Sequence, residues 1–77
     1  MNQNNKIKII EIISKIAKIN LDQINESTSM NDFSKWDSLA HLQIMLEIEK
    51  KFQIKISTSK MSELDSVIKI IKFVNSN

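Results

Sequence analysis

Isoleucine recurs at helical spacing near the start of the chain, and this pattern does most to limit the possible folds. Over residues 6–19, apolar side chains return every three or four positions while charged residues take the opposite side. The pattern predicts an amphipathic helix over residues 6–19, with Asn20 as its C-cap. The expected inward residues are Ile9, Ile12, Ile13, Ile16 and Ile19, and the expected outward residues are Lys8, Glu11, Lys15 and Lys18.

Three further helices are predicted in the second half of the chain. Asp37 is a typical N-cap for a second helix over residues 38–52. The polar stretch 57–64 allows a short third helix, anchored by Met61 and Leu64. Residues 53–56 alternate like a strand but have no partner strand, so they are predicted to be an extended connection. A last helix is capped by Asp65 or Ser66, with Val67, Ile70, Ile71 and Val74 facing inward and Lys69 and Lys72 facing outward.

Two segments lack a helical pattern. Residues 1–5 are polar and are expected to form a disordered N-terminus. Residues 20–37 are rich in polar turn formers, and we expect a long ordered loop that is pinned over the helices by apolar side chains. The predicted fold is therefore all-α, a four-helix bundle forming a single domain over residues 6–75. The apolar residues of the loop are Leu21, Ile24, Met30, Phe33 and Trp36.

The composition of the chain excludes several classes of function. Its 77 residues include no cysteine and no glycine, which removes disulfides, thiolate metal sites and glycine-rich phosphate loops. A single histidine disfavours a zinc site. The net charge is only +2 and all eleven basic residues are lysine, which argues against nucleic-acid recognition. Charged residues interrupt the apolar run near the start, so we predict no signal peptide or membrane span. We expect a cytoplasmic protein that is a monomer.

The second predicted helix is apolar on two sides. At about 100° per residue, Ile44, Ile48 and Phe52 share one stripe, while Leu39, Leu42 and Leu46 share another that lies on a different side of the helix. One stripe is enough to pack a helix into a small bundle. The second stripe is either covered by Phe33 or Trp36 from the loop, or it is a surface where a partner docks. Glu47 and Glu49 lie near the second stripe. They either pair with basic groups of a partner or are ordinary solvated charges of a helix.

Asp37-Ser38-Leu39 places a serine hydroxyl at the start of this helix. The free backbone N–H groups and partial positive charge of a helix N-terminus stabilise a phosphate, so Ser38 is a candidate for phosphate attachment. The alternative is that Asp37 is an ordinary cap and Ser38 fills the first turn. His41 is one turn away, but a hydrolase also needs a group that orients the histidine, an oxyanion site and a pocket. We therefore expect no catalytic residue, and expect His41 at the surface or partly buried.

The run that begins at Trp36-Asp37-Ser38-Leu39 resembles the acyl carrier protein family, the phosphopantetheine-binding carrier domains. The likeness continues without a gap to about Val74, through the Glu-Lys-Lys-Phe end of the second helix and the spacing of the last helix. The lengths of the first helix and of the long loop also agree. The residues that carry the likeness between these points are Leu42, Ile44, Glu47, Ile48, Glu49, Phe52, Ile56, Val67 and Ile71.

This resemblance implies a function and a site. In such carriers the motif serine, here Ser38, receives 4'-phosphopantetheine from coenzyme A through a separate phosphopantetheinyl transferase. The arm then holds an acyl or aminoacyl group as a thioester and presents it to acyl-loading and acyl-transfer enzymes. The carrier itself is not an enzyme and binds no metal. The positions expected to meet partner enzymes are Asp37, Leu39, Leu42, Leu46 and Glu49.

The chain also departs from the usual pattern of this family. Ala40, Gln43 and Lys50 stand where fatty-acid carriers often have acidic residues, and Trp36 stands where glycine is common. These departures favour a free-standing carrier of a specialised pathway, which could be polyketide-like, peptide-synthetase-like or glycan-modifying. Two other interpretations stay open at this point. One is a carrier-like interaction module that lacks the arm, and the other is a small helical nucleic-acid-binding domain.

Overall fold

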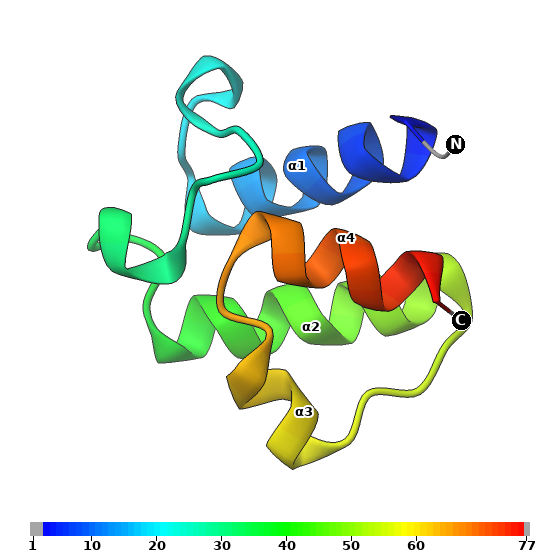
Figure 1. Cartoon of the computed structure of the whole chain (residues 1–77). Coiled ribbons are helices and arrows are strands. Elements are labelled where there is room, and N and C mark those ends of the chain that lie inside the picture. Colours follow the sequence, from blue (N-terminus) through cyan, green and yellow to red (C-terminus); the bar gives the residue numbers. More distant parts are fainter. Residues whose placement is uncertain (1–2, 77) are drawn as a thin grey trace.

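Four α-helices make up most of the described part of the chain, residues 3–76, in a computed structural model (Figure 1). The helix α1 packs against both α2 and α4, and the short α3 crosses the end of this layer. The predicted all-α fold with a short third helix is confirmed. The helices are α1 (Gln3–Ala17), α2 (Ser38–Phe52), α3 (Thr58–Glu63) and α4 (Val67–Asn75), and the loop between α1 and α2 holds two 3-10 turns, η1 (Leu21–Gln23) and η2 (Met30–Asp32).

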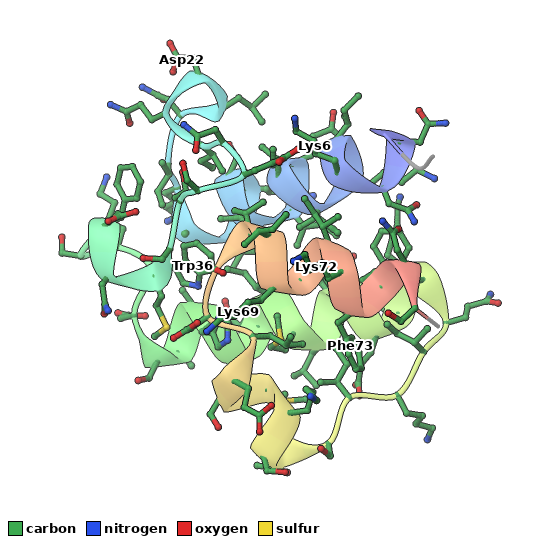
Figure 2. The ribbon with its side chains drawn as sticks, viewed as in Figure 1. Lys6, Asp22, Trp36, Lys69, Lys72 and Phe73 are labelled. Carbon is green, nitrogen blue, oxygen red and sulfur yellow. The ribbon has the colours of Figure 1, made fainter. Side chains whose placement is uncertain are left out.

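The helical periodicities of the sequence build one hydrophobic core. The first helix contributes Ile9 and Ile13, which are fully buried, and α2 contributes Ile44 and Ile48. All four inward positions predicted for the last helix are buried, while Lys69 and Lys72 lie on the outer side of α4 (Figure 2). The helices α1, α2 and α4 therefore each have an apolar face against the core, as the spacing predicts.

The start of α1 and the end of α4 lie together at one end of the bundle. The side-chain amide of Asn5 donates to Oδ1 of Asn75 at 2.9 Å, which joins the start of α1 to the end of α4. Two residues of the predicted disordered segment 1–5 lie outside the described residues, and the other three belong to α1.

The first helix ends earlier than the sequence predicts. Lys18 has a left-handed backbone (φ 59°) directly after Ala17, and the N–H of Ile19 donates to the carbonyl of Ser14 at 3.1 Å. This six-to-one hydrogen bond closes the helix two residues before the expected C-cap. The prediction that Asn20 caps α1 is therefore wrong, and Asn20 instead precedes the turn η1.

The long loop is held by main-chain hydrogen bonds as well as by apolar side chains. Met30 donates to the carbonyl of Asp65 at 2.9 Å, and Val67 donates to the carbonyl of Thr28 at 3.0 Å. These two bonds join the loop to the start of α4. Of the apolar residues expected to pin the loop, Ile24 and Trp36 are buried and Met30 and Phe33 are half-buried. Leu21 is 52% exposed, so its predicted anchoring role is wrong.

Candidate functional site

The start of α2 is fixed by Asp37, and this places Ser38 in the first turn. Oδ1 of Asp37 accepts a hydrogen bond from the N–H of Ala40 at 2.9 Å, and the backbone carbonyl of Asp37 accepts one from the backbone N–H of His41 at 2.8 Å. Asp37 is therefore the N-cap, as the sequence predicts, and Ser38 is the first helical residue. Because the aspartate satisfies the cap, the serine side chain is not needed for that role.

The hydroxyl of Ser38 is exposed and has no partner. Within residues 3–76 no hydrogen bond engages this hydroxyl, nor the backbone N–H groups of Ser38 and Leu39. Ser57 and Ser66, the N-caps of α3 and α4, differ from Ser38, because each side chain accepts a hydrogen bond from the backbone N–H three residues later. The first turn of α2 thus offers a free hydroxyl beside two free N–H groups, at the end of the helix that stabilises an anion.

A cavity of about 340 Å³ opens beside Ser38. It lies between the start of α2, the turn η2 and the helix α3, and it has both apolar and hydroxyl-bearing walls. The residues that line it include Thr58 and Ser62, which carry hydroxyl groups, and Met30, Leu42 and Met61, whose side chains are apolar. A phosphate at Ser38 with a flexible polar arm is compatible with these residues.

A hydrogen-bonded chain ties the segment before Ser38 to α2 and α3. The indole N–H of Trp36 donates to Nδ1 of His41 at 2.9 Å, and Nε2 of His41 lies 2.9 Å from the carbonyl oxygen of Met61. Since Nδ1 accepts, the neutral ring carries its proton on Nε2 and donates it to Met61. Both rings are buried, with Trp36 only 1% exposed. We refer to this set of three residues as the indole–imidazole bridge.

The bridge determines what His41 can do. Both ring nitrogens are engaged with partners other than Ser38, so His41 has no free lone pair to accept the serine proton. The expectation that His41 lies at the surface or partly buried is wrong, because it is buried between α2 and α3. Its role is to position the two helices that border the cavity. Among residues 3–76, no group of three acidic, histidine or cysteine side chains could hold a metal ion.

The structure places the five expected docking residues in two groups. Asp37, Leu39, Leu42 and Leu46 are exposed, and the three leucines lie along one side of α2, beginning next to Ser38. The exposed fractions of the three leucines are 66%, 46% and 49%, so neither Phe33 nor Trp36 covers the second apolar stripe. Glu49 stands apart from this group. Its Oε2 accepts the N–H of Ile56 at 2.7 Å, which holds the connection between α2 and α3 against α2.

Two features near the site were not predicted from the sequence. The indole–imidazole bridge is one, and the hydrogen bonds between the loop and the start of α4 are the other. In the sequence, the only signal for the indole–imidazole bridge is that Trp36 and His41 lie five residues apart, on either side of a helix start. The partner of His41 in α3 is a backbone carbonyl, which any residue at position 61 would supply.

Comparisons with known proteins agree with this geometry. The model of the phosphopantetheine attachment site family matches residues 8–74, which include all four helices of the described chain except the first five residues of α1 and the last residue of α4. The chain is also 37% identical to the acyl carrier protein of Buchnera aphidicola subsp. Schizaphis graminum (strain Sg) over 68 residues, which cover 88% of this chain and 86% of that protein.

Proposed function

The chain belongs to the acyl carrier protein family, a family of non-catalytic carriers with a phosphopantetheine attachment site, and we propose that the attachment residue is Ser38. The observation that carries this assignment is the free hydroxyl at the capped start of α2, beside two unpaired N–H groups. When attached, the arm's terminal thiol supplies the thioester bond by which an acyl group is carried. The carrier domain spans residues 6–75, because its core extends from Ile9 to Val74.

In this proposal the residues around Ser38 hold and orient the arm, and none of them forms a covalent bond during its attachment. The N–H groups of Ser38 and Leu39 would hydrogen-bond the phosphate, and the positive end of α2 would stabilise its charge. In the adjoining cavity, Thr58 would hydrogen-bond the polar part of the arm, and the hydroxyl of Ser62, which already donates to the carbonyl of Ser59, would accept a hydrogen bond from it. Because the ring of His41 is fully occupied, the group that removes the serine proton during attachment belongs to the transferase and not to this chain.

The family implies two kinds of partner, a phosphopantetheinyl transferase and enzymes that load or transfer acyl groups. A free-standing carrier of a specialised pathway fits this chain best, since Ala40, Gln43 and Lys50 leave α2 with little negative charge. Such a surface binds weakly to the basic patches of general fatty-acid enzymes. If a general fatty-acid synthase elongates acyl chains on this carrier as fast as on its own carrier, the specialised assignment is wrong. The chain acts as a monomer in the cytoplasm in this proposal.

The attachment site is tested by intact mass spectrometry. The full chain is incubated with coenzyme A and a broad-range phosphopantetheinyl transferase, and we expect the mass to rise by one phosphopantetheine. Ser38→Ala is expected to abolish the gain. Failure of the wild-type chain to gain mass with several transferases would support a carrier-like module without an arm and overturn the proposal.

Ser34 provides a matched control for this test. It is exposed like Ser38, and within residues 3–76 its hydroxyl also makes no hydrogen bond, but it lies in the loop and not at the start of a helix. Ser34→Ala should therefore be modified as completely as the wild-type chain. Loss of modification in Ser34→Ala, with Ser38→Ala still modified, would show that the arm is attached to Ser34 and would overturn the proposal.

A further inference from the structure

The short helix α3 forms one wall of the cavity beside Ser38, and few contacts hold it there. None of its six residues is buried. Its apolar anchors are the half-buried Met61 and two buried residues just outside the helix, Ile56 and Leu64. Isolated helices shorter than about 12–15 residues are marginal in water. A helix as short as α3 therefore keeps its internal hydrogen bonds only while the rest of the fold holds it in place.

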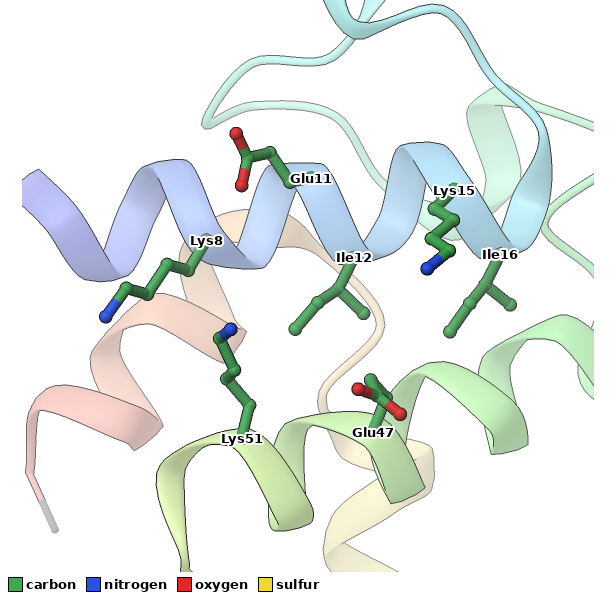
Figure 3. Close-up of a pocket in the computed structure, with 7 residues that line it drawn as sticks. All are labelled: Lys8, Glu11, Ile12, Lys15, Ile16, Glu47 and Lys51. Atoms are coloured by element: carbon green, nitrogen blue, oxygen red, sulfur yellow. The ribbon is translucent and has the colours of Figure 1, made fainter.

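The contact between α1 and α2 is built differently. Ile9 and Ile13 of α1 are fully buried, and Ile12 and Ile16 point toward α2 across the groove between the two helices (Figure 3). Lysines and glutamates line the edges of this groove, and within residues 3–76 no hydrogen bond or ion pair joins them across it. Apolar packing thus holds α1 against α2, and this contact depends on no titratable group.

The link from α3 to α2 is the indole–imidazole bridge. Nε2 of His41 lies 2.9 Å from the carbonyl oxygen of Met61, and within residues 3–76 no other hydrogen bond joins these two helices. On its other side, α3 meets α4 where Nζ of Lys60 lies 5.9 Å from the ring centre of Phe73. The position of α3 against α2 therefore depends on the ring of one histidine.

This link requires a neutral histidine ring. Nδ1 of His41 accepts the indole N–H of Trp36, which can only donate, and Nε2 donates to the carbonyl of Met61, which can only accept. A second proton would go to Nδ1 and place two N–H donors opposite each other at 2.9 Å. The imidazolium would also be a buried charge with no carboxylate in the bridge, which is costly. Because the ring lines the cavity, it would relieve both costs by turning out of the bridge into the cavity.

The charged residues around this ring are of other types. Among their side chains and that of His41, only histidine ordinarily changes its charge between about pH 5 and pH 8. The carboxylate of Asp65, which lines the same cavity, pairs with Lys69 at 3.0 Å and is not part of the bridge. The charged residues on the segments that border the ring are Asp32 and Lys35 in the loop, Asp37 at the start of α2, Lys60 and Glu63 in α3, and Asp65 and Lys69 around the start of α4.

We propose that His41 is a positioning residue that holds α3 as the wall of this cavity only while its ring is neutral. When the ring takes up a second proton, it leaves Trp36 and Met61 and frees α3 to move away from α2. The closed bridge is thus stable above the pH at which a free histidine is protonated, and it is lost as the pH falls. On the basis of the proposed function, an arm on Ser38 would then lose the wall formed by α3.

Hydrogen exchange of the unmodified full chain, followed by NMR, tests this proposal. The N–H groups of Met61 and Leu64 donate to the carbonyls of Ser57 and Lys60, so their protection factors report the opening of α3. Since histidine in water has a pKa of about 6.5, we expect these protection factors to fall about 20-fold between about pH 7 and about pH 5. At both pH values they should stay below the protection factor of Ile13 in α1, because α3 opens without unfolding of the core.

His41→Gln is the matched control. A glutamine amide can accept the indole N–H and donate to the carbonyl of Met61, but it takes up no proton, so the protection of α3 should be the same at both pH values. Trp36→Phe is a second variant that does not rely on the glutamine. It removes the donor that faces Nδ1, so the ring can be protonated without leaving Met61, and the fall in protection should shrink.

Three results would overturn the proposal. The first is equal protection of Met61 and Leu64 at the two pH values in the wild-type chain. The second is an equal fall in His41→Gln, which would assign the effect to carboxylates. The third is protection of α3 that matches that of Ile13, which would mean that α3 opens only when the whole chain unfolds. None of these measurements needs an arm on Ser38, so the mass test of the attachment site succeeds or fails separately.

Discussion

The two sides of α2 carry similar side chains and have opposite environments. Ile44 and Ile48 are fully buried in the hydrophobic core, whereas Leu39 and Leu42 are exposed to solvent. Burial of an aliphatic side chain stabilises a fold by about 1.5–3 kcal/mol, so the first pair contributes to folding and the second contributes little. A helix with an unused apolar side indicates a second requirement besides folding. We propose that in this chain the requirement is contact with partners beside Ser38.

The largest expected effect on stability belongs to the buried side. Ile48→Ala leaves a cavity in the core, and we expect it to lower the free energy of unfolding by about 2–5 kcal/mol. Urea denaturation followed by far-UV circular dichroism measures the change. A loss below about 0.5 kcal/mol, within the range of an exposed substitution, would show that the core does not distinguish the two sides of the helix.

The indole–imidazole bridge should give the next largest effect. His41→Phe keeps a ring of similar size but leaves the buried indole N–H of Trp36 and the carbonyl of Met61 without partners, at a cost of about 1–3 kcal/mol. A double-mutant cycle with Trp36→Phe measures the coupling between the two rings. Strictly additive effects of the two substitutions would contradict the bridge.

Removing the helix cap should cost less. Asp37→Ala deletes the acceptor for the N–H of Ala40, and we expect a loss of about 1 kcal/mol in the same denaturation assay. Asp37→Asn keeps an acceptor oxygen and should retain most of the stability. An alanine variant as stable as wild type would mean that Asp37 does not fix the start of α2.

The smallest effect is expected on the exposed side. Leu42→Ala should change the free energy of unfolding by less than about 0.5 kcal/mol, because the side chain is already in contact with water. The comparison with Ile48→Ala tests the contrast between the two sides of α2 directly. A loss of 2 kcal/mol or more, about that of a core residue, would mean that Leu42 belongs to the core.

The sequence predicts the helices well where local chemistry sets their limits. Asp37 marks the start of α2 through a side-chain acceptor, and the predicted range 38–52 matches the observed helix. The end of α1 is not predicted correctly, because the usual signal is a glycine in the left-handed conformation after the last turn. This chain has no glycine and uses other residues at that position. Here Lys18 and Gln53 take the left-handed conformation after α1 and α2, and neither residue type signals a helix end.

The site is predicted in part, for a physical reason. Ser38 and the leucine row follow from the position and period of residues in one helix. The burial of His41 does not, because it depends on Trp36 from the loop and on the main chain of α3, twenty residues later. The engagement of Glu49 by the N–H of Ile56 is also invisible in the sequence. Contacts between elements decide which polar side chains remain free, and a single sequence does not give those contacts.

The most direct test of this account is the position of the arm on the chain as it is made in its own cells. Trypsin cleaves after Lys35 and Lys50 and releases the peptide 36–50, in which Ser38 is the only serine. Fragmentation mass spectrometry of this peptide is predicted to show one phosphopantetheine on Ser38. Recovery of peptide 36–50 only in the unmodified form, with the arm on another peptide, would contradict the central claim.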